Sequence, residues 1–173
     1  MGDPKKPKKK YNAPTHPWNK ERIEAEKILT REYGLKNKKE IWRMNSLLKN
    51  FSKQAKMSII TKTKQGELEN QNLLKRLTKL GLIKSGGQID DILSLTIRDI
   101  CERRLQTLVV KKGFARSVKQ ARQFIVHRHI KLGDKKVTAP SYLVSTEEEA
   151  AMTFSENSNL ANEEHPERSI QEK

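Results

Sequence analysis

The amino-acid sequence predicts a mostly helical α+β protein. An N-terminal helical region precedes a small α/β domain of two packed helices and a β-hairpin or small sheet. Apolar residues recur at helical spacing between residues 20 and 109. Beyond residue 129, apolar and basic residues alternate around a Gly-Asp pair, which is typical of a hairpin. We expect a disordered basic arm over 1–17, a helical region over 18–96, the α/β domain over 97–154 and an acidic disordered tail over 155–173.

Capping residues predict the first two helices. Asn19 can cap a helix that runs to Tyr33, where Gly34 provides a left-handed stop. Asn37 and Glu40 have the spacing of a capping box and open a longer helix. One stripe of that helix is apolar and its other faces are basic. The apolar positions are Ile41, Met44, Leu48, Phe51 and Ala55, and the basic ones are Lys38, Lys39, Arg43, Lys49 and Lys53.

Two more helical segments follow. A polar linker over 61–66 precedes a third helix, which stops at Gly81. A short segment then follows the glycine turn at 85–87, with Asp90 and Asp91 in its first turn. The apolar residues of the third helix are Leu73, Leu74, Leu77 and Leu80, and those of the short segment are Ile89, Ile92 and Leu93.

Thr96 and Asp99 begin a fourth long helix, which we expect to end at Gly113. After a very short turn, Ser117 and Gln120 can cap a further helix, so that the two helices pack against each other. The apolar stripe of the fourth helix is Ile97, Cys101, Leu105, Leu108 and Val109. The apolar face of the further helix is Val118, Ala121 and Ile125.

The predicted hairpin covers residues 130–137, and we expect its lysines to line one side. The segment 152–154 is a candidate for a last strand.

The charge of the chain predicts a polyanionic partner. The formal net charge is +15 and the isoelectric point is about 9.9, and neutralised phosphates release counterions, so nucleic acid is the first candidate. The segment 146–173 has eight acidic and two basic residues, so the positive charge lies before it. The basic arm is either a solvated tail or a segment that RNA orders.

The helix that Ser117 caps and the hairpin carry the residues expected to bind RNA. Arginine and glutamine suit phosphates and base edges, and the helix N-terminus adds unpaired backbone donors. For any one lysine a solvated surface is the simpler interpretation, but no acid between Lys111 and Lys131 balances the cluster. The candidates from this pattern are Ser117, Lys119, Arg122, Gln123, His127, Lys131, Lys135 and Lys136.

Other classes of function find little support. Cys101 is the single cysteine, so neither a disulfide framework nor a cysteine zinc site is expected. His127 and His129 cannot both face one way on a helix and lack further ligands, which argues against a metal. Catalytic and nucleotide-binding motifs are missing, as are a membrane span and a signal peptide. We expect no enzyme, no cofactor, no metal and no membrane partner, and a cytoplasmic location.

Four motifs closely resemble the S-four RNA-binding domain: Arg103-Arg104-Leu105, the segment 113–117, Gln120-Ala121-Arg122-Gln123 and His129-Ile130. The flanking segments 32–43, 72–77, 91–93 and 102–107 look like the archaeal and eukaryotic form of the small-subunit ribosomal protein S-four family. The resemblance covers roughly residues 18–144. By motif position it adds Arg104, Arg116 and Gln120 to the expected RNA contacts, which we complete with Arg103, Lys112, Arg128 and His129.

The resemblance implies a structural role in the ribosome. Proteins of this family bind small-subunit ribosomal RNA at a junction in its five-prime domain, early in subunit assembly. They contact ribosomal protein S-five near the messenger entry and influence decoding accuracy. We therefore expect ribosomal RNA, S-five and messenger RNA as partners. Some bacterial relatives hold zinc with an N-terminal cysteine cluster, which this chain lacks, so zinc is not implied.

Two alternatives remain. A free-standing RNA chaperone or regulator would use the same domain and have little need for the helices over 19–80. An RNA-modifying enzyme would need a catalytic domain with a committed aspartate, and the positions upstream of residue 97 offer none.

Overall fold

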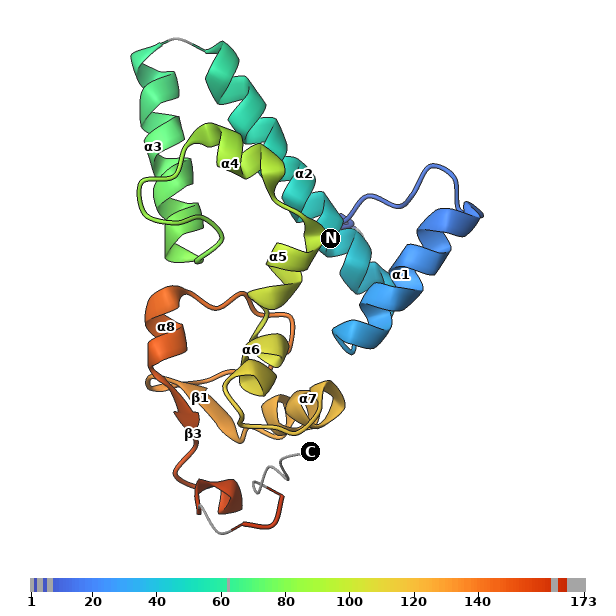
Figure 1. Cartoon of the computed structure of the whole chain (residues 1–173), viewed down its shortest axis with the longest axis vertical. Helices are drawn as coiled ribbons and strands as arrows, with labels where there is room; N and C mark the ends of the chain where they lie inside the picture. The colour runs from blue at the N-terminus through green and yellow to red at the C-terminus, as the bar shows by residue number, and fades with distance from the viewer. Residues whose placement is uncertain (1, 3–4, 6–7, 62, 163–164, 168–173) are drawn as a thin grey trace.

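The computed structural model describes the chain except residues 1, 3–4, 6–7, 62, 163–164 and 168–173. Helices fill one end of the elongated molecule and the α/β part fills the other (Figure 1), which confirms the mostly helical α+β class. No helix among the described residues is long and apolar enough to cross a membrane. The elements are α1 Lys20–Glu32, α2 Lys38–Ile60, α3 Lys64–Lys79, α4 Ile89–Ser94, α5 Ile97–Glu102, α6 Leu105–Lys111, α7 Val118–Val126, β1 Ile130–Leu132, β2 Lys135–Lys136, α8 Thr146–Ala150, β3 Met152–Phe154 and the 3-10 helix η1 Asn159–Ala161.

The predicted caps of α1 and α2 are confirmed. Asn19 and Asn37 accept hydrogen bonds from backbone N–H groups of the first turns, and Gly34 has a φ of +57° after α1. Glu40 does not complete a capping box at Asn37, because its carboxylate is engaged by arginines of the α/β part. The apolar stripe of α2 is buried at four of its five predicted positions, Ile41, Met44, Phe51 and Ala55.

The linker prediction for 61–66 was wrong in extent. Thr63 caps α3, which therefore starts at Lys64, inside the expected linker. Gly66 makes this compact turn between α2 and α3 possible, because a Cβ there would lie 2.5 Å from the Thr61 carbonyl oxygen. The short helix over Ile89–Ser94 is confirmed, with Asp90 and Asp91 in its first turn.

The prediction of one long helix from Thr96 to Gly113 was also wrong. The chain breaks into α5 and α6 because Arg104 is extended, with a ψ of 142°. Its backbone forms an isolated bridge to Leu143, and the Leu105 N–H donates to the Tyr142 carbonyl at 2.8 Å. The loop before α8 thus takes hydrogen bonds that a continuous helix would have used internally.

The α/β part is built on the antiparallel sheet β2-β1-β3. The hairpin around Gly133 and the third strand at 152–154 are confirmed. In the register, Lys131 lies opposite Lys136 and Leu132 lies opposite Lys135. Because side chains alternate along a strand, Lys135 lies on the other face from Lys131 and Lys136, so the expected single row of lysines is wrong.

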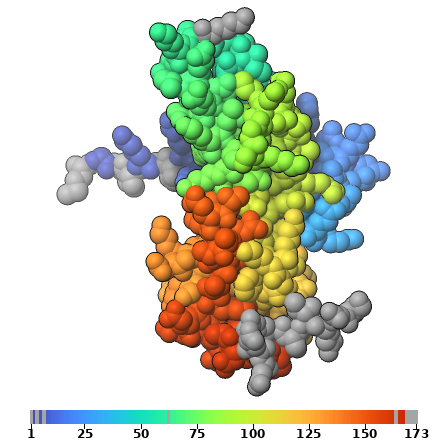
Figure 2. Space-filling view, turned by 60° about the vertical axis from the view of Figure 1, so that its left-hand side comes forward, coloured from blue at the N-terminus to red at the C-terminus, as the bar shows by residue number. Residues whose placement is uncertain are grey.

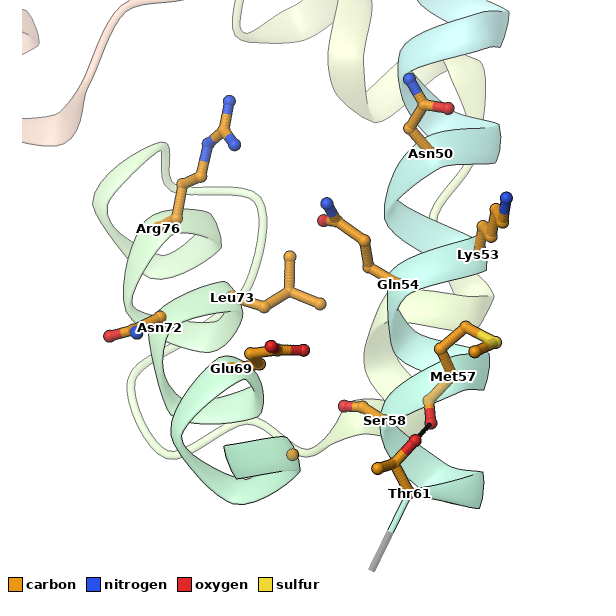
Figure 3. A pocket seen from close by; sticks show the side chains of 11 residues that line it. Asn50, Lys53, Gln54, Met57, Ser58, Thr61, Glu69, Asn72, Leu73 and Arg76 are labelled. Carbon is orange, nitrogen blue, oxygen red and sulfur yellow. Dashed lines mark hydrogen bonds between the residues drawn. The ribbon is translucent and has the colours of Figure 1, made fainter. Parts of the chain in front are cut away.

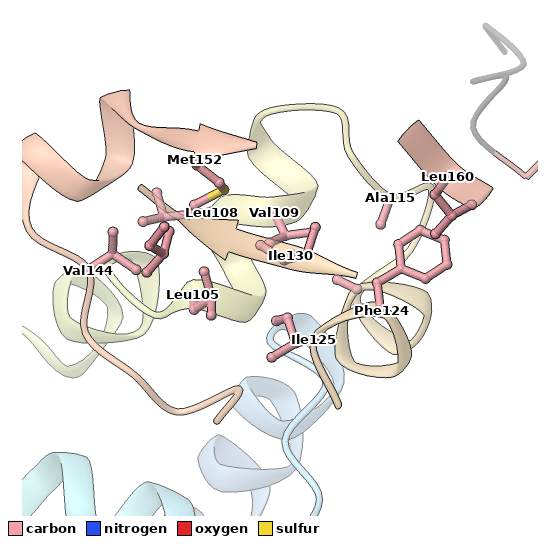
Figure 4. Close-up of a cluster of buried hydrophobic side chains, with 12 residues drawn as sticks. Leu105, Leu108, Val109, Ala115, Phe124, Ile125, Ile130, Val144, Met152 and Leu160 are labelled. Carbon is pink, nitrogen blue, oxygen red and sulfur yellow. The ribbon is translucent and has the colours of Figure 1, made fainter. Parts of the chain in front are cut away.

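The core of the α/β part lies between the sheet and helices α6 and α7 (Figure 4). Ala121, Ile125 and Ile130 are fully buried in it. Leu160 of η1 also belongs to this core, beside Phe124 (Figure 4). We expected a disordered tail to begin after residue 154. The packed chain extends further, because the apolar side chain of Leu160 follows the last strand. Residues 163–164 and 168–173 of that tail lie outside the described residues.

The N-terminal arm also makes contacts. The rings of Tyr11 and Trp42 are 5.9 Å apart, and the Asn12 N–H donates to Ser46 Oγ at 2.9 Å. This end of the arm therefore packs on α2, contrary to the expected disorder. Positions 1, 3–4 and 6–7 of the arm lie outside the described residues.

Two further clusters of apolar side chains hold the helical part and join it to the α/β part. One lies among α2, α3 and α4, with Phe51 and Leu77 buried. The other joins α2 to α5 and includes Ile41 and Ile100. The two parts also meet where α8 lies against the end of α3 (Figure 2). There, Thr146 Oγ1 donates to the Lys79 carbonyl at 3.3 Å.

Candidate nucleic-acid interface

The outer face of α7 carries three of the predicted residues in one row. Lys119, Gln123 and His127 are exposed and follow one another at spacings of four, so they share one side of the helix. Arg116 is also exposed and precedes the N-cap Ser117. The opposite side is buried in the core. Basic and amide side chains therefore stand together on a rigid helix.

The N-terminus of α7 is capped as the sequence predicts. Ser117 Oγ accepts the Gln120 N–H at 3.2 Å. The Gln120 side chain accepts the Arg116 N–H at 2.8 Å, where a complete capping box would have used the N–H of Ser117. The Ser117 hydroxyl and the side-chain oxygen of Gln120 are therefore both engaged at the start of the helix. The bond to Gln120 also fixes the backbone at Arg116.

A basic groove of about 810 Å³ lies where α1 approaches α7. Its lining residues include five basic side chains and no acidic one. Three of these, Arg116, Lys119 and Arg122, come from the segment that the sequence analysis selected. The other two, Arg31 and Lys36, come from α1 and the turn after it, and the sequence analysis missed them. They flank Gly34, so the glycine stop was the available indication that this turn approaches another element.

Gly34 brings α1 to α7. A Cβ at Gly34 would lie 2.8 Å from Val118 Cγ1, so only glycine permits the approach. The Gln106 side chain completes the contact, because its Nε2 donates to the Val118 carbonyl at 2.8 Å and to the Gly34 carbonyl at 3.3 Å. We call the groove lined by Arg31, Lys36, Arg116, Lys119 and Arg122 the basic groove.

Glu40 of α2 binds two of the predicted arginines. Its Oε2 lies 2.7 Å from Arg104 Nη2, and its Oε1 lies 3.2 Å from Arg122 Nη2. Burial alone would raise the pKa of the Glu40 carboxyl, but hydrogen bonds and charge from both arginines outweigh it and hold the pKa below its ordinary value of 4.5. The pair with Arg104 joins the helical part to the α/β part.

This geometry corrects the prediction for Arg104. Its side chain is only 2% exposed and forms the interior ion pair with Glu40, so it does not offer a surface for RNA. Arg122 is partly exposed at 27% and lines the basic groove while it is held by Glu40. Arg122 therefore presents part of its side chain at the basic groove, which Arg104 does not.

Arg103 and Lys112 also lie apart from the α7 face. Arg103 Nη1 pairs with Glu149 at 2.7 Å, and its Nη2 donates to the Val144 carbonyl at 3.1 Å. Lys112 donates to the Glu149 carbonyl. Both side chains hold α8 in place, and Arg103 is only 14% exposed, so the structure does not bring them to the same surface as α7.

The segment after α7 arranges two histidines side by side. Arg128, which is exposed, has a φ of +65°, and this conformation turns the chain between its neighbours. The rings of His127 and His129 are stacked with centroids 6.2 Å apart. The expectation that they cannot face one way applied to a helix, but α7 ends at Val126, before both of them. Burial first, and the charge of His127 second, lower the pKa of His129. No group of three or more metal-binding side chains occurs among the described residues.

One of the three hairpin lysines is paired with an acid, and the other two are exposed. Lys131 lies 2.5 Å from the Glu156 carboxylate, whereas Lys135 and Lys136 are exposed. The sheet therefore offers Lys135 and Lys136 to a partner on opposite faces of the hairpin.

A second groove of about 630 Å³ lies between α2 and α3 (Figure 3). Gln54, Leu73 and Glu69 point into it, and Arg76 and Lys53 lie at its sides. Its mixed lining, with a carboxylate in the interior, suits a phosphate backbone less well than the basic groove does.

Comparison with known proteins defines the class and then the family. The S4 domain matches residues 103–149, so this is a protein of the S4-domain class. The chain is 51% identical over 169 residues to small ribosomal subunit protein uS4 of Methanococcus aeolicus, covering 97% of this chain and 96% of that one. It is 50% identical over 169 residues to small ribosomal subunit protein uS4 of Methanococcus maripaludis, covering 97% and 95% of the two chains. The chain belongs to the uS4 family of small-ribosomal-subunit proteins.

Proposed function

We propose that the chain is a structural component of the small ribosomal subunit and binds its ribosomal RNA directly through the α7 face and the basic groove. The observation that carries the proposal is the groove itself, in which five basic side chains from two parts of the chain converge without an acid. Such a surface neutralises phosphates and fits RNA by shape. The membership of the uS4 family supports the same role and argues against an enzyme.

The preferred RNA is a helix junction in the five-prime domain of small-subunit ribosomal RNA. A groove between two rigid parts can meet two helical arms at once, which suits a junction better than a single duplex. The wider role follows from the family resemblance: early binding in subunit assembly, contact with ribosomal protein S-five and messenger RNA near its entry, and an influence on decoding accuracy. The chain would then act in cytoplasmic ribosomes.

The test is a salt-titrated affinity for five-prime-domain RNA, with transfer RNA as competitor. We expect the wild-type chain to prefer the five-prime domain. The double variant Lys36→Ala/Lys119→Ala should bind it more weakly, because it removes two of the five groove cations. The double variant Lys75→Ala/Lys84→Ala is the matched control, since both lysines are exposed and lie outside the groove. Equal affinity for both RNAs would favour the free-standing chaperone, and equal loss in the control would contradict the groove.

A further inference from the structure

The chain after β3 returns across the α/β part and touches residues of the predicted RNA surface. It is anchored by Leu160, which is 4% exposed and belongs to the core. Ser155 and Ser158 are also buried, and the Ser155 N–H donates to the His129 carbonyl at 2.7 Å. Residues 155–162 and 165–167, which we call the C-terminal strap, are therefore tied to the core at their first half.

The anchored half of the strap meets the hairpin and the histidine pair. Glu156 lies 2.5 Å from Lys131. Ser158 Oγ accepts the Leu160 N–H at 3.1 Å, so its own hydrogen is available to His129 Nδ1 at 2.7 Å. This arrangement places a carboxylate and a hydroxyl on two side chains that we expected to face RNA.

The far half of the strap meets the N-terminus of α7. The Pro166 carbonyl accepts a hydrogen bond from the Arg116 guanidinium. The Glu167 carbonyl lies 3.4 Å from Gln120 Nε2. Both acceptors are backbone oxygens, placed on donors that would otherwise suit phosphate oxygens. Arg116 also lines the basic groove, so the strap ends at the edge of that site.

We propose that the C-terminal strap competes with RNA for the α7 face and thereby makes binding selective. Arg116, Gln120, His129 and Lys131 each have a partner in the strap in the free chain, and an RNA must supply better partners to displace it. An RNA that contacts the α7 face and the basic groove together can do so. An RNA held by charge alone gains less and is disfavoured. This inference rests on the proposed RNA-binding function of the α7 face.

The acidic character of the region supports competition. Residues 155–173 contain five glutamates, in a chain whose net charge is +15. Glu156 pairs with Lys131, and a carboxylate beside a cation repels phosphates as well as replacing them. The anchor at Leu160 keeps the far half close to α7 even when it is displaced, so it can return as soon as a weak RNA leaves.

The experiment compares the full chain with a variant that ends at Asn162. This variant keeps the Leu160 anchor and loses four glutamates and two basic residues. The control is full-length Glu24→Gln/Glu69→Gln, which neutralises two exposed carboxylates in the helical part and gains the same net charge. Each protein is titrated with transfer RNA and with five-prime-domain RNA, after its thermal midpoint has been shown to match that of the wild type.

We expect the shortened chain to bind transfer RNA about three- to tenfold tighter, because the open form is then always populated, and five-prime-domain RNA less than about twofold tighter. The control should change both affinities little and equally. If the shortened chain binds transfer RNA no tighter than the control does, competition by the strap is overturned. Failure of the proposed function would be seen separately, as a wild-type chain without preference for five-prime-domain RNA.

A second measurement tests the strap in the full chain. A spin label on Glu167→Cys should broaden the backbone resonances of Arg116 and Gln120, since Cys101 is buried and escapes labelling. Addition of five-prime-domain RNA should remove the broadening, and transfer RNA at the same concentration should leave it. Absence of broadening in the free chain would also overturn the proposal.

Discussion

The carboxylate of Glu40 on α2 lies 2.7 Å from the guanidinium of Arg104, in the break between α5 and α6. This ion pair crosses from the helical part to the α/β part, and the other oxygen of the same carboxylate holds Arg122 at the basic groove. One acid therefore couples the joint between the two parts to the orientation of a predicted RNA contact.

Arg104→Ala should destabilise the chain before it affects RNA binding. The substitution leaves Glu40 with one arginine in a partly buried position, and loss of one partner of a buried ion pair costs about 3 kcal/mol. Urea unfolding measures the change in free energy. Lys39→Ala, at an exposed neighbour of Glu40, is the control and should lie within about 0.5 kcal/mol of wild type. An unchanged urea midpoint for Arg104→Ala would show that the pair contributes nothing.

The stability of the chain should depend on pH through Glu40. The folded-state pKa lies below the ordinary value of 4.5, so the unfolded chain takes up the proton first as pH falls. The stabilisation is complete above pH 4.5 and is lost as pH falls through the folded pKa. Unfolding free energies of wild type and Glu40→Gln, measured from pH 7 downward, should therefore converge below pH 4.5. A constant difference over that range would contradict the shift.

Gly34→Ala should weaken the contact between α1 and α7. Gly34 has a φ of +57°, and an added Cβ would lie 2.8 Å from Val118 Cγ1. Gly133→Ala is a matched control, because Gly133 has a φ of +58° and nothing within 4 Å of the added Cβ. Both variants pay about 1–2 kcal/mol for the left-handed backbone. Thermal unfolding should show a larger loss for Gly34→Ala, and equal losses would mean that α1 moves aside freely.

Lys119→Ala should weaken RNA binding without a change in stability. Lys119 is exposed and lines the basic groove, so its loss should lower affinity for every RNA and reduce the slope of log affinity against log salt by about 1. Filter binding at several salt concentrations gives both quantities. An unchanged slope would remove Lys119 from the phosphate contacts.

Ala121→Leu should harm folding through the packing of α6 against α7. Ala121 is fully buried in the core of the α/β part, and additional methylenes in a packed core cost about 1–3 kcal/mol. The thermal midpoint should fall accordingly. A midpoint equal to that of wild type would show that the helices separate without cost.

Local rules were sufficient for most of the helices and for the hairpin. A helix cap is a contact within one turn, so the sequence alone predicts the helix starts at Asn19, Asn37 and Ser117. The helix ends at Gly34 and Gly113 are predicted for the same reason. The break at Arg104 has a cause 39 residues away, at Leu143, whose backbone pairs with it. Apolar periodicity continues across the break, so the sequence pattern alone predicts an uninterrupted helix.

The candidate site was predicted in part. The row of Lys119, Gln123 and His127 follows from helical spacing and is found exposed. Arg116, which the resemblance added, is exposed just before the helix cap. Spacing does not reveal which arginine an acid from another element will bury, and Arg104, which the resemblance added to the expected RNA contacts, is buried beside Glu40. Nor does it reveal that Arg31 and Lys36 belong to the groove, because their approach to α7 depends on the tertiary packing at Gly34.

The interior is divided into three small clusters, and this division affects how the chain unfolds. The cluster among α2, α3 and α4 draws on residues 51–92, whereas that of the α/β part draws on residues 105–160. Each can lose its packing while the other persists, so all-or-none unfolding depends on the contacts between the two parts, which lie at Glu40, at Gly34 and between α3 and α8. With those contacts removed, amide hydrogen exchange should separate into two groups of protons, one for each half of the molecule.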